Sequence, residues 1–556
     1  MRELQLSPGA ARAAALAALV ALGAAAGCTV KTDVVATGAS AGNVSHLWIT
    51  VNEVWLSTAA DTPPESDAGW KKTVLAAPVA VDLATQSPSA LASQVTTEAG
   101  TYRQIHLVTA DSGDTLSSAA QAAGLASNAQ ISITDSSGTL NTAPLESPVP
   151  GYGITIATDI ALQGSLDLGG STSSTGTAST STAKTATLAL AIDGARDVLP
   201  YSYGTTTGYV LSPITAAADE SRAGAISGTI DRTALAAAAG PISVSAELPD
   251  ATNTHHVVVQ RRVIGSGGAF TLYPLPAPTL GTTSYDLVIA GAGAQTLIIR
   301  GVAVAAADLT APVVVQSTPL VLAAAPTVYA DIPAQAPVLP GGARVAFYQT
   351  IAASGELPYQ VDGTAIDLVS RRLPGDAFAL GSGPLMVGNY AGGGAISFAT
   401  LAPVEGNGGF VIGSEGQYRA DTLTRVPAVI SGSSSAPTPI LPPIPGVAAG
   451  GSAGVLSVTL NATAGLYDSG ILVIAAGNRV VDAANVGALL AAGGGTVNFT
   501  NVPSGSALAP SGGVPYQVAV RAWNSNNASA SLVRVASSSS VVLAAGSRGS
   551  LTLQLE

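Results

Sequence analysis

Two strings of the form Gly-x-Ser-x-Gly are the first residues of this chain that could do chemistry, because that spacing surrounds the nucleophile of many hydrolases. They span 38–42 and 450–454 and centre on Ser40 and Ser452. Such a nucleophile must follow a strand and open a helix. Ser40 lies among small polar residues, whereas Ser452 leads into a strand-like segment and no histidine follows it. The strings therefore do not predict a hydrolase, and we expect no catalytic residue.

Histidine and cysteine are too scarce in this sequence to indicate a metal site. The chain has four histidines and one cysteine, and none has the spacing of a zinc site. His255 and His256 are neighbours in a strand-like segment, so their side chains point to opposite faces. The segment 111–114 (Asp-Ser-Gly-Asp) lacks the alternating acidic positions of a calcium loop and indicates a turn. We therefore expect no metal and no other cofactor.

Two patterns indicate a binding surface more weakly. Tyr102, Gln104 and His106 alternate along a strand-like segment and so share one face, which is either a polar binding surface or a face packed beneath a loop. Trp523 and Asn524 place an aromatic ring beside amides, the residue types that stack on sugars and hydrogen-bond to them. The alternative for this second pair is a hairpin turn with a half-buried tryptophan.

The single cysteine follows a leader at the start of the chain. Arg2 and Arg12 give this leader positive charge, and 13–27 is an uncharged apolar run of the length of a signal-peptide core. It ends in Ala24-Ala25-Ala26-Gly27-Cys28, which resembles the lipobox of bacterial lipoproteins, although Ala25 stands where that motif usually has leucine. The resemblance implies cleavage after residue 27 and attachment of lipid to Cys28. An ordinary secretory peptide, cut after an Ala-x-Ala triplet, is the alternative.

Location follows from the same resemblance. One exported thiol cannot form an internal disulfide, which favours a specific use for Cys28. More than one acyl chain would also be needed for stable anchoring. Thr29 after the cysteine, in place of aspartate, implies the outer membrane in the family that the motif resembles. We expect a protein lipid-anchored to the bacterial outer membrane, on its periplasmic face or at the cell surface.

Composition predicts an all-β chain. Charged residues are 10% and aromatic residues 4% of the sequence, with 62 Gly and 34 Pro, which is typical of many short strands joined by turns. Removing the leader with Arg2, Glu3 and Arg12 takes the formal net charge from −12 to −13. Nucleic-acid binding needs clustered basic residues, so we expect no nucleic-acid partner.

The first domain after the leader has a recognisable order of motifs. We expect a tether at 28–43, then a β-rich domain at 44–222 with a disordered low-complexity loop at 169–185. Within it the apolar alternation switches parity near Asn52-Glu53, which predicts a β-bulge. The motifs, in order, are 51–56 (VNEVWL), 81–83 (VDL), 99–105 (AGTYRQI), 150–153 (PGYG), 191–193 (AID) with Arg196-Asp197, and 208–213 (GYVLSP). This order resembles the bacterial lipoprotein domain of unknown function numbered 4382, which implies location and architecture but no activity.

A sequence motif then occurs three times: a phenylalanine, a turn marked by proline, and a tyrosine that opens a strand. The phenylalanines are Phe270, Phe398 and Phe499, and the tyrosines are Tyr285, Tyr418 and Tyr516. This arrangement is typical of a small antiparallel sandwich, and 224–315 resembles the transthyretin-like regulatory domain of carboxypeptidases. We therefore predict tandem β-sandwiches of immunoglobulin- or transthyretin-like type at 223–315, 316–430 and 452–556, with a Pro/Gly/Ser linker at 431–451.

These observations favour a non-catalytic, lipid-anchored envelope protein whose sandwiches bind or present a surface to a glycan or an envelope protein. A structural spacer or adhesin-like stalk without a small ligand is the second hypothesis. An anchored hydrolase is the third, and it would depend on paired carboxylates that the sequence does not reveal.

Overall fold

The computed structural model describes residues 29–555 except 40–43, 60–67, 85–88, 99, 135–139, 152, 163–185, 204–205, 214–216, 236–239, 266, 279, 307–310, 334–338, 354, 374–377, 417–418, 426–429, 448–451, 478, 505–513, 526–533 and 538–540. The predicted leader, Cys28 and the predicted loop at 169–185 lie outside the described residues. Among the described helices, none is long and apolar enough to cross a membrane.

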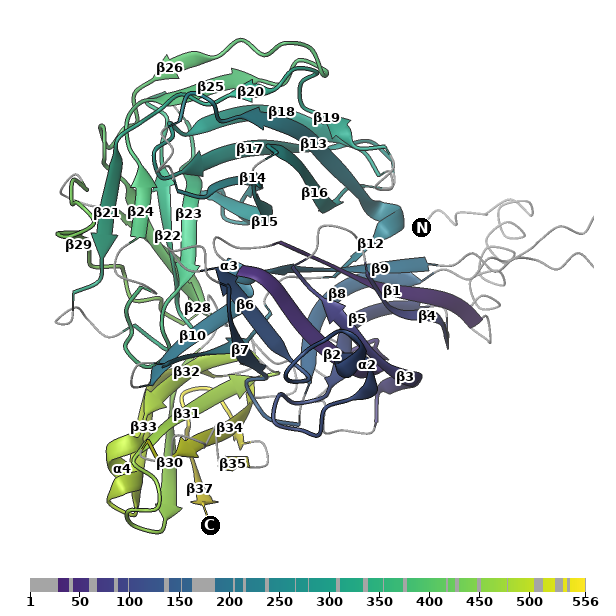
Figure 1. Cartoon of the computed structure of the whole chain (residues 1–556), viewed down its shortest axis with the longest axis vertical. Coiled ribbons are helices and arrows are strands. Elements are labelled where there is room, and N and C mark those ends of the chain that lie inside the picture. Colours follow the sequence, from purple (N-terminus) through teal and green to yellow (C-terminus); the bar gives the residue numbers. More distant parts are fainter. Residues whose placement is uncertain are drawn as a thin grey trace, which may run out of the picture.

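The first unit is one twelve-stranded sheet (Figure 1). The bulge predicted near Asn52-Glu53 is confirmed, because the register of β2 against β3 and against β5 shifts between Val51 and Glu53. Two short helices, α2 (Ser118–Ala122) and α3 (Gly194–Asp197), interrupt the strands. The strands are β1 (Thr29–Ala39), β2 (Val44–Ser57), β3 (Trp70–Asp82), β4 (Ser89–Glu98), β5 (Gly100–Thr109), β6 (Gln130–Thr134), β7 (Leu140–Glu146), β8 (Ile154–Leu162), β9 (Ala186–Asp193), β10 (Val198–Tyr203), β11 (Thr206–Leu211) and β12 (Ala217–Asp219).

The tether predicted at 28–43 is largely wrong. Residues 29–39 form β1, which pairs antiparallel with β4 and parallel with β9 inside the first sheet. The small polar residues suggested a linker, yet Thr32, Val34 and Ala36 are fully buried and alternate with the half-buried Asp33 and Val35. A strand of small residues can pack between neighbouring strands, so the composition of this segment did not distinguish a linker from a buried strand.

The second unit packs two sheets face to face. One sheet contains β13 (Ala223–Asp231), β16 (Ala269–Pro276), β19 (Val313–Val314) and β20 (Leu320–Val321). The other has the order β15-β14-β17-β18-β25-β26. Its strands are β14 (Ile242–Pro249), β15 (His256–Val263), β17 (Thr283–Gly291), β18 (Leu297–Val304), β25 (Leu385–Asn389) and β26 (Ala399–Leu401).

The six-stranded sheet corrects the boundary predicted between 315 and 316, because β25 and β26 come from the segment assigned to the next sandwich. β25 pairs in parallel with β18. Both faces of the sheet are buried: Leu287 and Ile289 face the core of the second unit, whereas Val288 and Ala290 face the core of the third. The continuous apolar run in β17 is the sequence signal for a strand covered on both faces. The second and third units therefore share a layer.

The third unit completes its core with two smaller sheets, of orders β24-β21-β29 and β23-β22-β27-β28. The linker predicted at 431–451 is partly wrong: Ile440 is buried in this core, and β29 pairs with β21. The strands are β21 (Thr327–Asp331), β22 (Arg344–Gln349), β23 (Tyr359–Ala365), β24 (Phe378–Gly381), β27 (Val411–Gly416), β28 (Arg419–Arg425) and β29 (Thr438–Pro439).

The fourth unit is a sandwich of a three-stranded sheet, β33-β30-β37, and a five-stranded sheet, β32-β31-β34-β35 with β36 beside β34. α4 (Gly487–Ala491) covers one end. Its strands are β30 (Ser452–Ala462), β31 (Ser469–Ala476), β32 (Arg479–Asn485), β33 (Gly494–Ser504), β34 (Val514–Trp523), β35 (Arg534–Ser537), β36 (Val541–Leu543) and β37 (Arg548–Leu555). The all-β, multi-sheet fold class predicted from the sequence is confirmed.

The recurring phenylalanine–proline–tyrosine motif makes the same hydrogen bond in two of its three copies. Tyr285 donates a hydrogen bond to the carbonyl of Pro276, and Tyr516 donates one to the carbonyl of Pro503. Each tyrosine thus ties the start of its strand to the turn before it, while the phenylalanine fills the core. In the middle copy, Tyr418 lies outside the described residues.

Candidate functional site

The strand face predicted as a binding surface is buried. Tyr102, Gln104 and His106 are 1%, 8% and 2% exposed on β5. The ring of His106 contacts those of Trp55 and Trp70, with centroid distances of 5.0 and 5.7 Å, and the two tryptophan rings also contact each other at 6.1 Å. Burial, with the nearby charge of Lys72, lowers the pKa of His106 to about 4, so its imidazole is neutral near pH 7. These side chains pack inside the first unit, and the prediction of an open surface is wrong here.

The second predicted pair is also unsuited to stacking on a sugar. Trp523 is 6% exposed and belongs to a cluster of side chains from the first, third and fourth units. Asn524, half-buried at the end of β34, donates a hydrogen bond to the carbonyl of Leu466. The tryptophan therefore helps to join units, and it is more deeply buried than the alternative of a half-buried tryptophan at a hairpin turn implied.

The other residues considered from the sequence do not assemble into a reactive centre. Ser452 opens β30 rather than a helix, and Ser40 lies outside the described residues. Asp111 and Asp114 form a turn in which the amide of Asp111 donates to the carboxylate of Asp114. Across the described ranges, no group of three or more His, Cys, Asp or Glu side chains could hold a metal ion.

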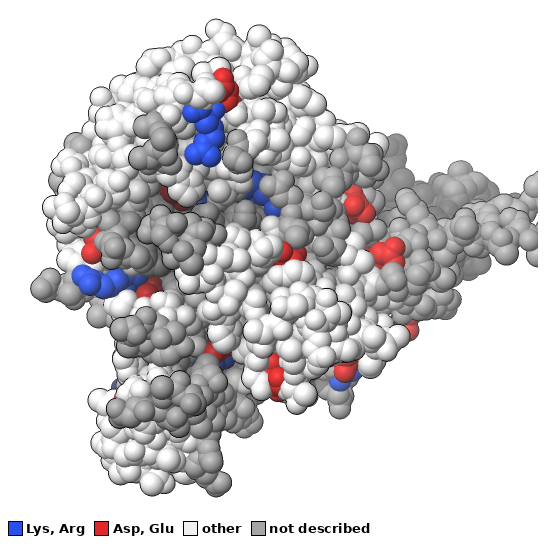
Figure 2. All heavy atoms as spheres, in the orientation of Figure 1, with Lys and Arg blue, Asp and Glu red and all other residues white. Residues whose placement is uncertain are grey.

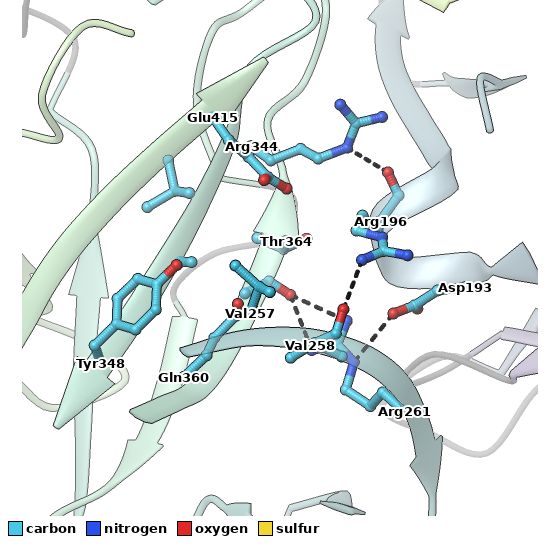
Figure 3. A pocket seen from close by; sticks show the side chains of 13 residues that line it. Asp193, Arg196, Val257, Val258, Arg261, Arg344, Tyr348, Gln360, Thr364 and Glu415 are labelled. Atoms are coloured by element: carbon cyan, nitrogen blue, oxygen red, sulfur yellow. Dashed lines mark hydrogen bonds and ion pairs between the residues drawn. The ribbon is translucent and has the colours of Figure 1, made fainter. Parts of the chain in front are cut away.

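The residues that the structure does bring together are arginines at the meeting point of the first three units. Arg196 of α3, Arg261 of β15 and Arg344 of β22 line a cavity of about 40 Å³ together with Asp193 and Glu415 (Figure 3). A cavity of this size holds a few water molecules rather than an organic ligand. Figure 3 shows the guanidinium group of Arg196 between those of Arg344 and Arg261.

Each of these arginines bonds across a boundary between units. Arg261 lies 3.4 Å from the carboxylate of Asp193 in the first unit and 3.3 Å from that of Asp362 in the third. Arg196 donates to the carbonyl of Val258 at 3.0 Å. Arg344 donates to carbonyls of the first unit, including that of Ser212 at 3.3 Å. Burial lowers the pKa of Arg344, but it starts so high that the group stays charged near pH 7.

A second ion pair joins the first and fourth units. Arg521 of β34 is 2% exposed and bonds to the carboxylate of Glu146 at the end of β7. Tyr201 also donates to Glu146, at 2.9 Å. Burial raises the pKa of Glu146, against the opposing effect of Arg521. A buried charge needs such partners, because desolvation is costly.

Further contacts join the third unit to its neighbours. Arg371 lies 3.1 Å from the carboxylate of Asp482 in the fourth unit, and Asp482 also accepts the amide of Gly341 at 2.7 Å. Ser202 of the first unit donates to Asp367 of the third at 2.7 Å. The first unit thus contacts the second, third and fourth units, and all four form one interconnected body.

Sequence reasoning missed these arginines, although a signal for them exists. Arg344 and Arg521 each lie in a strand with an apolar residue on either side, and Arg261 lies in a strand in which valines flank the polar run Gln260-Arg261-Arg262. An arginine at an apolar strand position is buried only when it is paired. Such positions could have been marked as expected ion pairs between units, but the sequence does not reveal their partners.

The fourth unit contacts the other units through its five-stranded sheet, so the outer side of its three-stranded sheet is not covered by them. Ile471, Val473 and Val480 of the five-stranded sheet pack into the cluster shared with the other units. The opposite, three-stranded sheet turns its second face outward, and we call this the C-terminal outer face. It consists of Val455, Ser457, Thr459 and Asn461 of β30, Thr496, Asn498 and Thr500 of β33, and Arg548, Ser550, Thr552 and Gln554 of β37, all exposed or half-buried.

Side chains on this face are aligned in cross-strand rows of hydroxyl and amide groups. The register puts Asn498, Ser457 and Ser550 in one row and Thr496, Thr459 and Thr552 in the next. Ser457 donates to Asn498 at 2.6 Å, and the hydroxyls of Thr459 and Thr496 lie 3.0 Å apart. Arg548 is the one charged residue of the C-terminal outer face. Figure 2 likewise shows few, scattered charged groups on one side of the molecule.

Comparison with known proteins identifies the first unit only. Residues 29–174 match the model of a family described as a domain of unknown function (DUF4382), which confirms the predicted resemblance over that range; the motifs at 191–193 and 208–213 lie outside the matched residues. No curated protein matches the sequence.

Solved structures resemble the chain only remotely. The Bacillus anthracis TIE protein has 9% identity and a TM-score of 0.13, covering 95% of this chain and 73% of that one. A streptococcal ancillary pilin has 10% identity and a TM-score of 0.12, covering 60% of this chain and 99% of that one. A tetra-tandem repeat from the extending region of a large adhesion protein has 11% identity and a TM-score of 0.09, with 80% and 96% covered. Scores of this size give no information about function.

Proposed function

We propose that this chain is a non-catalytic, lipid-anchored protein of the bacterial outer membrane, and that its C-terminal outer face binds a neutral glycan. The observation that carries the proposal is that face, an exposed array of hydroxyl and amide groups with one charged side chain. Hydroxyl and amide groups both donate and accept hydrogen bonds, as sugar hydroxyls do. A face with so little charge has no means of attracting a polyanion.

Anchoring is part of the proposal because the leader ends at Cys28 in a sequence that resembles a lipobox. β1 begins one residue after that cysteine, so a lipid on Cys28 would attach directly to the first sheet. The interconnected units would then hold the outer face at a fixed position relative to the anchor.

Rigid presentation fits the contacts better than an adhesin-like stalk does. In a stalk of repeated units, each unit contacts only its neighbours along the chain. Here the first unit contacts the fourth through Glu146 and Arg521, across 375 positions of sequence. An anchored hydrolase has no supporting observation among the described residues, since the polar clusters at the unit boundaries are buried.

Binding of the mature protein to insoluble neutral polysaccharides, such as cellulose and chitin, tests the proposal. Thr459→Lys and Thr552→Lys each place a charged, bulky side chain in the middle of the outer face. Each should weaken binding about tenfold or more, as loss of a central contact does. Thr101→Lys, at an exposed threonine of β5 in the first unit, is the matched control and should bind like the parent. Equal binding by all three variants would contradict the assignment of this face.

A further inference from the structure

A compact group of titratable side chains lies where β23 of the third unit crosses the second unit. Glu247 comes from β14, His256 from β15 and Asp286 from β17, while Tyr359 begins β23. Contacts of β23 with both β15 and β17 define this seam between the units. None of these four side chains takes part in the binding function proposed above.

Glu247 is fully buried, and its hydrogen bonds suit a neutral carboxyl group. Its Oε2 accepts the amide of Gln360 at 3.0 Å, and its Oε1 lies 2.8 Å from the hydroxyl of Ser245. That hydroxyl is also 3.3 Å from the carbonyl of Val288. A protonated Glu247 can donate to Ser245, which then donates to Val288. An ionised Glu247 only accepts, so it would take the hydroxyl proton of Ser245 away from Val288.

His256 is placed between acceptors on both ring nitrogens. Nδ1 lies 3.3 Å from the carbonyl of Pro358, and Nε2 lies 3.6 Å from the carboxylate of Asp286. The imidazole stacks on the ring of Tyr359, with centroids 4.1 Å apart and an angle of 11°. Tyr359 in turn donates to Asp286 at 3.0 Å. Two acceptors favour the imidazolium, which has a proton on each nitrogen.

The surrounding charged groups are paired among themselves. Arg300 lies 3.0 Å from Glu356 beside Tyr359. Arg261 is shared by Asp193 and Asp362 in the cavity, and its charge also interacts more weakly with that of Glu247. His255, on the opposite side of the strand from His256, lies 3.7 Å from Asp250. Protonation at the seam therefore depends mainly on Glu247, His256 and Asp286.

We propose that this group is a proton-operated clasp: with Glu247 neutral and His256 charged, β23 is held against the second unit, and loss of these protons loosens it. The clasp would make the seam between the second and third units tightest in mildly acidic surroundings. This inference is independent of glycan binding, because it concerns the joint between units rather than the outer face.

The shifts of pKa give the direction of the effect. Burial raises the pKa of Glu247 to about 7, so its stabilising contribution is complete below its ordinary value of 4.5 and is lost as the pH rises through about 7. Burial lowers the pKa of His256, but the opposing interactions, led by the hydrogen bond with Asp286, outweigh burial and raise the pKa overall, which gives the same sign. Burial raises the pKa of Asp286, yet its hydrogen bonds with His256, Gly301 and Tyr359 outweigh burial and lower the pKa overall. The stability that ionised Asp286 contributes is therefore lost only in strong acid.

Hydrogen exchange of the β23 amides, corrected for the intrinsic pH dependence of exchange, measures the clasp in the intact protein. Between pH 5 and pH 8 the opening equilibrium of these amides should rise on the order of 10²-fold, because Glu247 shifts from about 4.5 to about 7. Glu247→Gln keeps the shape and the donor to Ser245 but does not titrate. It should remove most of this rise and leave β23 better protected than the parent at pH 8.

Glu405→Gln is the matched control, since Glu405 also accepts one amide and one hydroxyl, both from Thr350. It should keep the pH dependence of the parent. His256→Gln tests the other half of the clasp and should raise opening at pH 5. A parent whose β23 opening is equal at pH 5 and pH 8, or a Glu247→Gln variant with an unchanged profile, would overturn the proposal.

Discussion

Removing Arg521 should detach the fourth unit from the first at a large cost in stability. The guanidinium is 2% exposed and the carboxylate of Glu146 is 6% exposed, so neither charge can recover hydration while the units remain docked. Arg521→Met keeps much of the apolar volume of the side chain but removes the positive charge that pairs with Glu146. The hydrogen bond from the hydroxyl of Tyr201 to Glu146 remains. Breaking one side of a buried ion pair costs about 3–5 kcal/mol.

The pH dependence of that loss identifies its cause. Without Arg521, the raised pKa of Glu146 should rise further, because the group that opposes the effect of burial is gone. A carboxyl group with a raised pKa stabilises the fold at low pH and loses that contribution as the pH rises. The deficit of Arg521→Met should therefore be largest at neutral and alkaline pH and should shrink toward pH 4.

A double-mutant cycle with Glu146→Gln separates the buried charge from lost packing. The double variant has no unpaired charge, and Tyr201 can still donate to the amide oxygen, so it should recover most of the lost stability. Urea unfolding followed by tryptophan emission is the assay, since Trp523 lies in the same junction. Arg548→Met, at an exposed arginine of the same unit, is the control and should change stability by less than about 0.5 kcal/mol. Equal losses in the single and double variants would refute the account of Glu146 as an uncompensated charge.

Two further predictions concern residues considered from the sequence. Cys28→Ser should abolish incorporation of labelled palmitate and shift the protein to the soluble fraction, and a variant that still partitions into detergent like the parent would contradict lipid attachment. Trp523→Ala should lower the unfolding free energy by about 3–5 kcal/mol, because a large ring leaves the cluster shared by three units, and circular dichroism during urea unfolding measures it; a loss below about 1 kcal/mol would show that the ring is not part of a packed junction.

Local patterns in the sequence predicted the strands but not the layers that they form. Alternation located β5 and β30, and the change of parity near Asn52-Glu53 located a real bulge. Alternation does not say how many faces of a strand are covered, so Tyr102 and His106 on the second face of β5 suggested a surface where the structure has packing. Composition misassigned β1 for a related reason, since small residues suit both linkers and tightly packed strands.

The boundaries between units depend on contacts between residues far apart in the sequence. The pairing of β25 with β18 joins residues nearly ninety positions apart, and no local pattern in either strand reveals its partner. The same holds for Glu146 and Arg521. Nothing in the spacing of Glu247, His256 and Asp286 predicts their meeting, because three different strands bring them together.

The most direct test of the central claim, that four units act as one interconnected body presenting the outer face, is calorimetry of the mature protein. Cooperative unfolding of one body should give a single transition with equal calorimetric and van't Hoff enthalpies. In Arg521→Met a separate, lower-temperature transition for the fourth unit should appear. Two or more well-separated transitions in the parent would show that the units unfold independently and would contradict the claim.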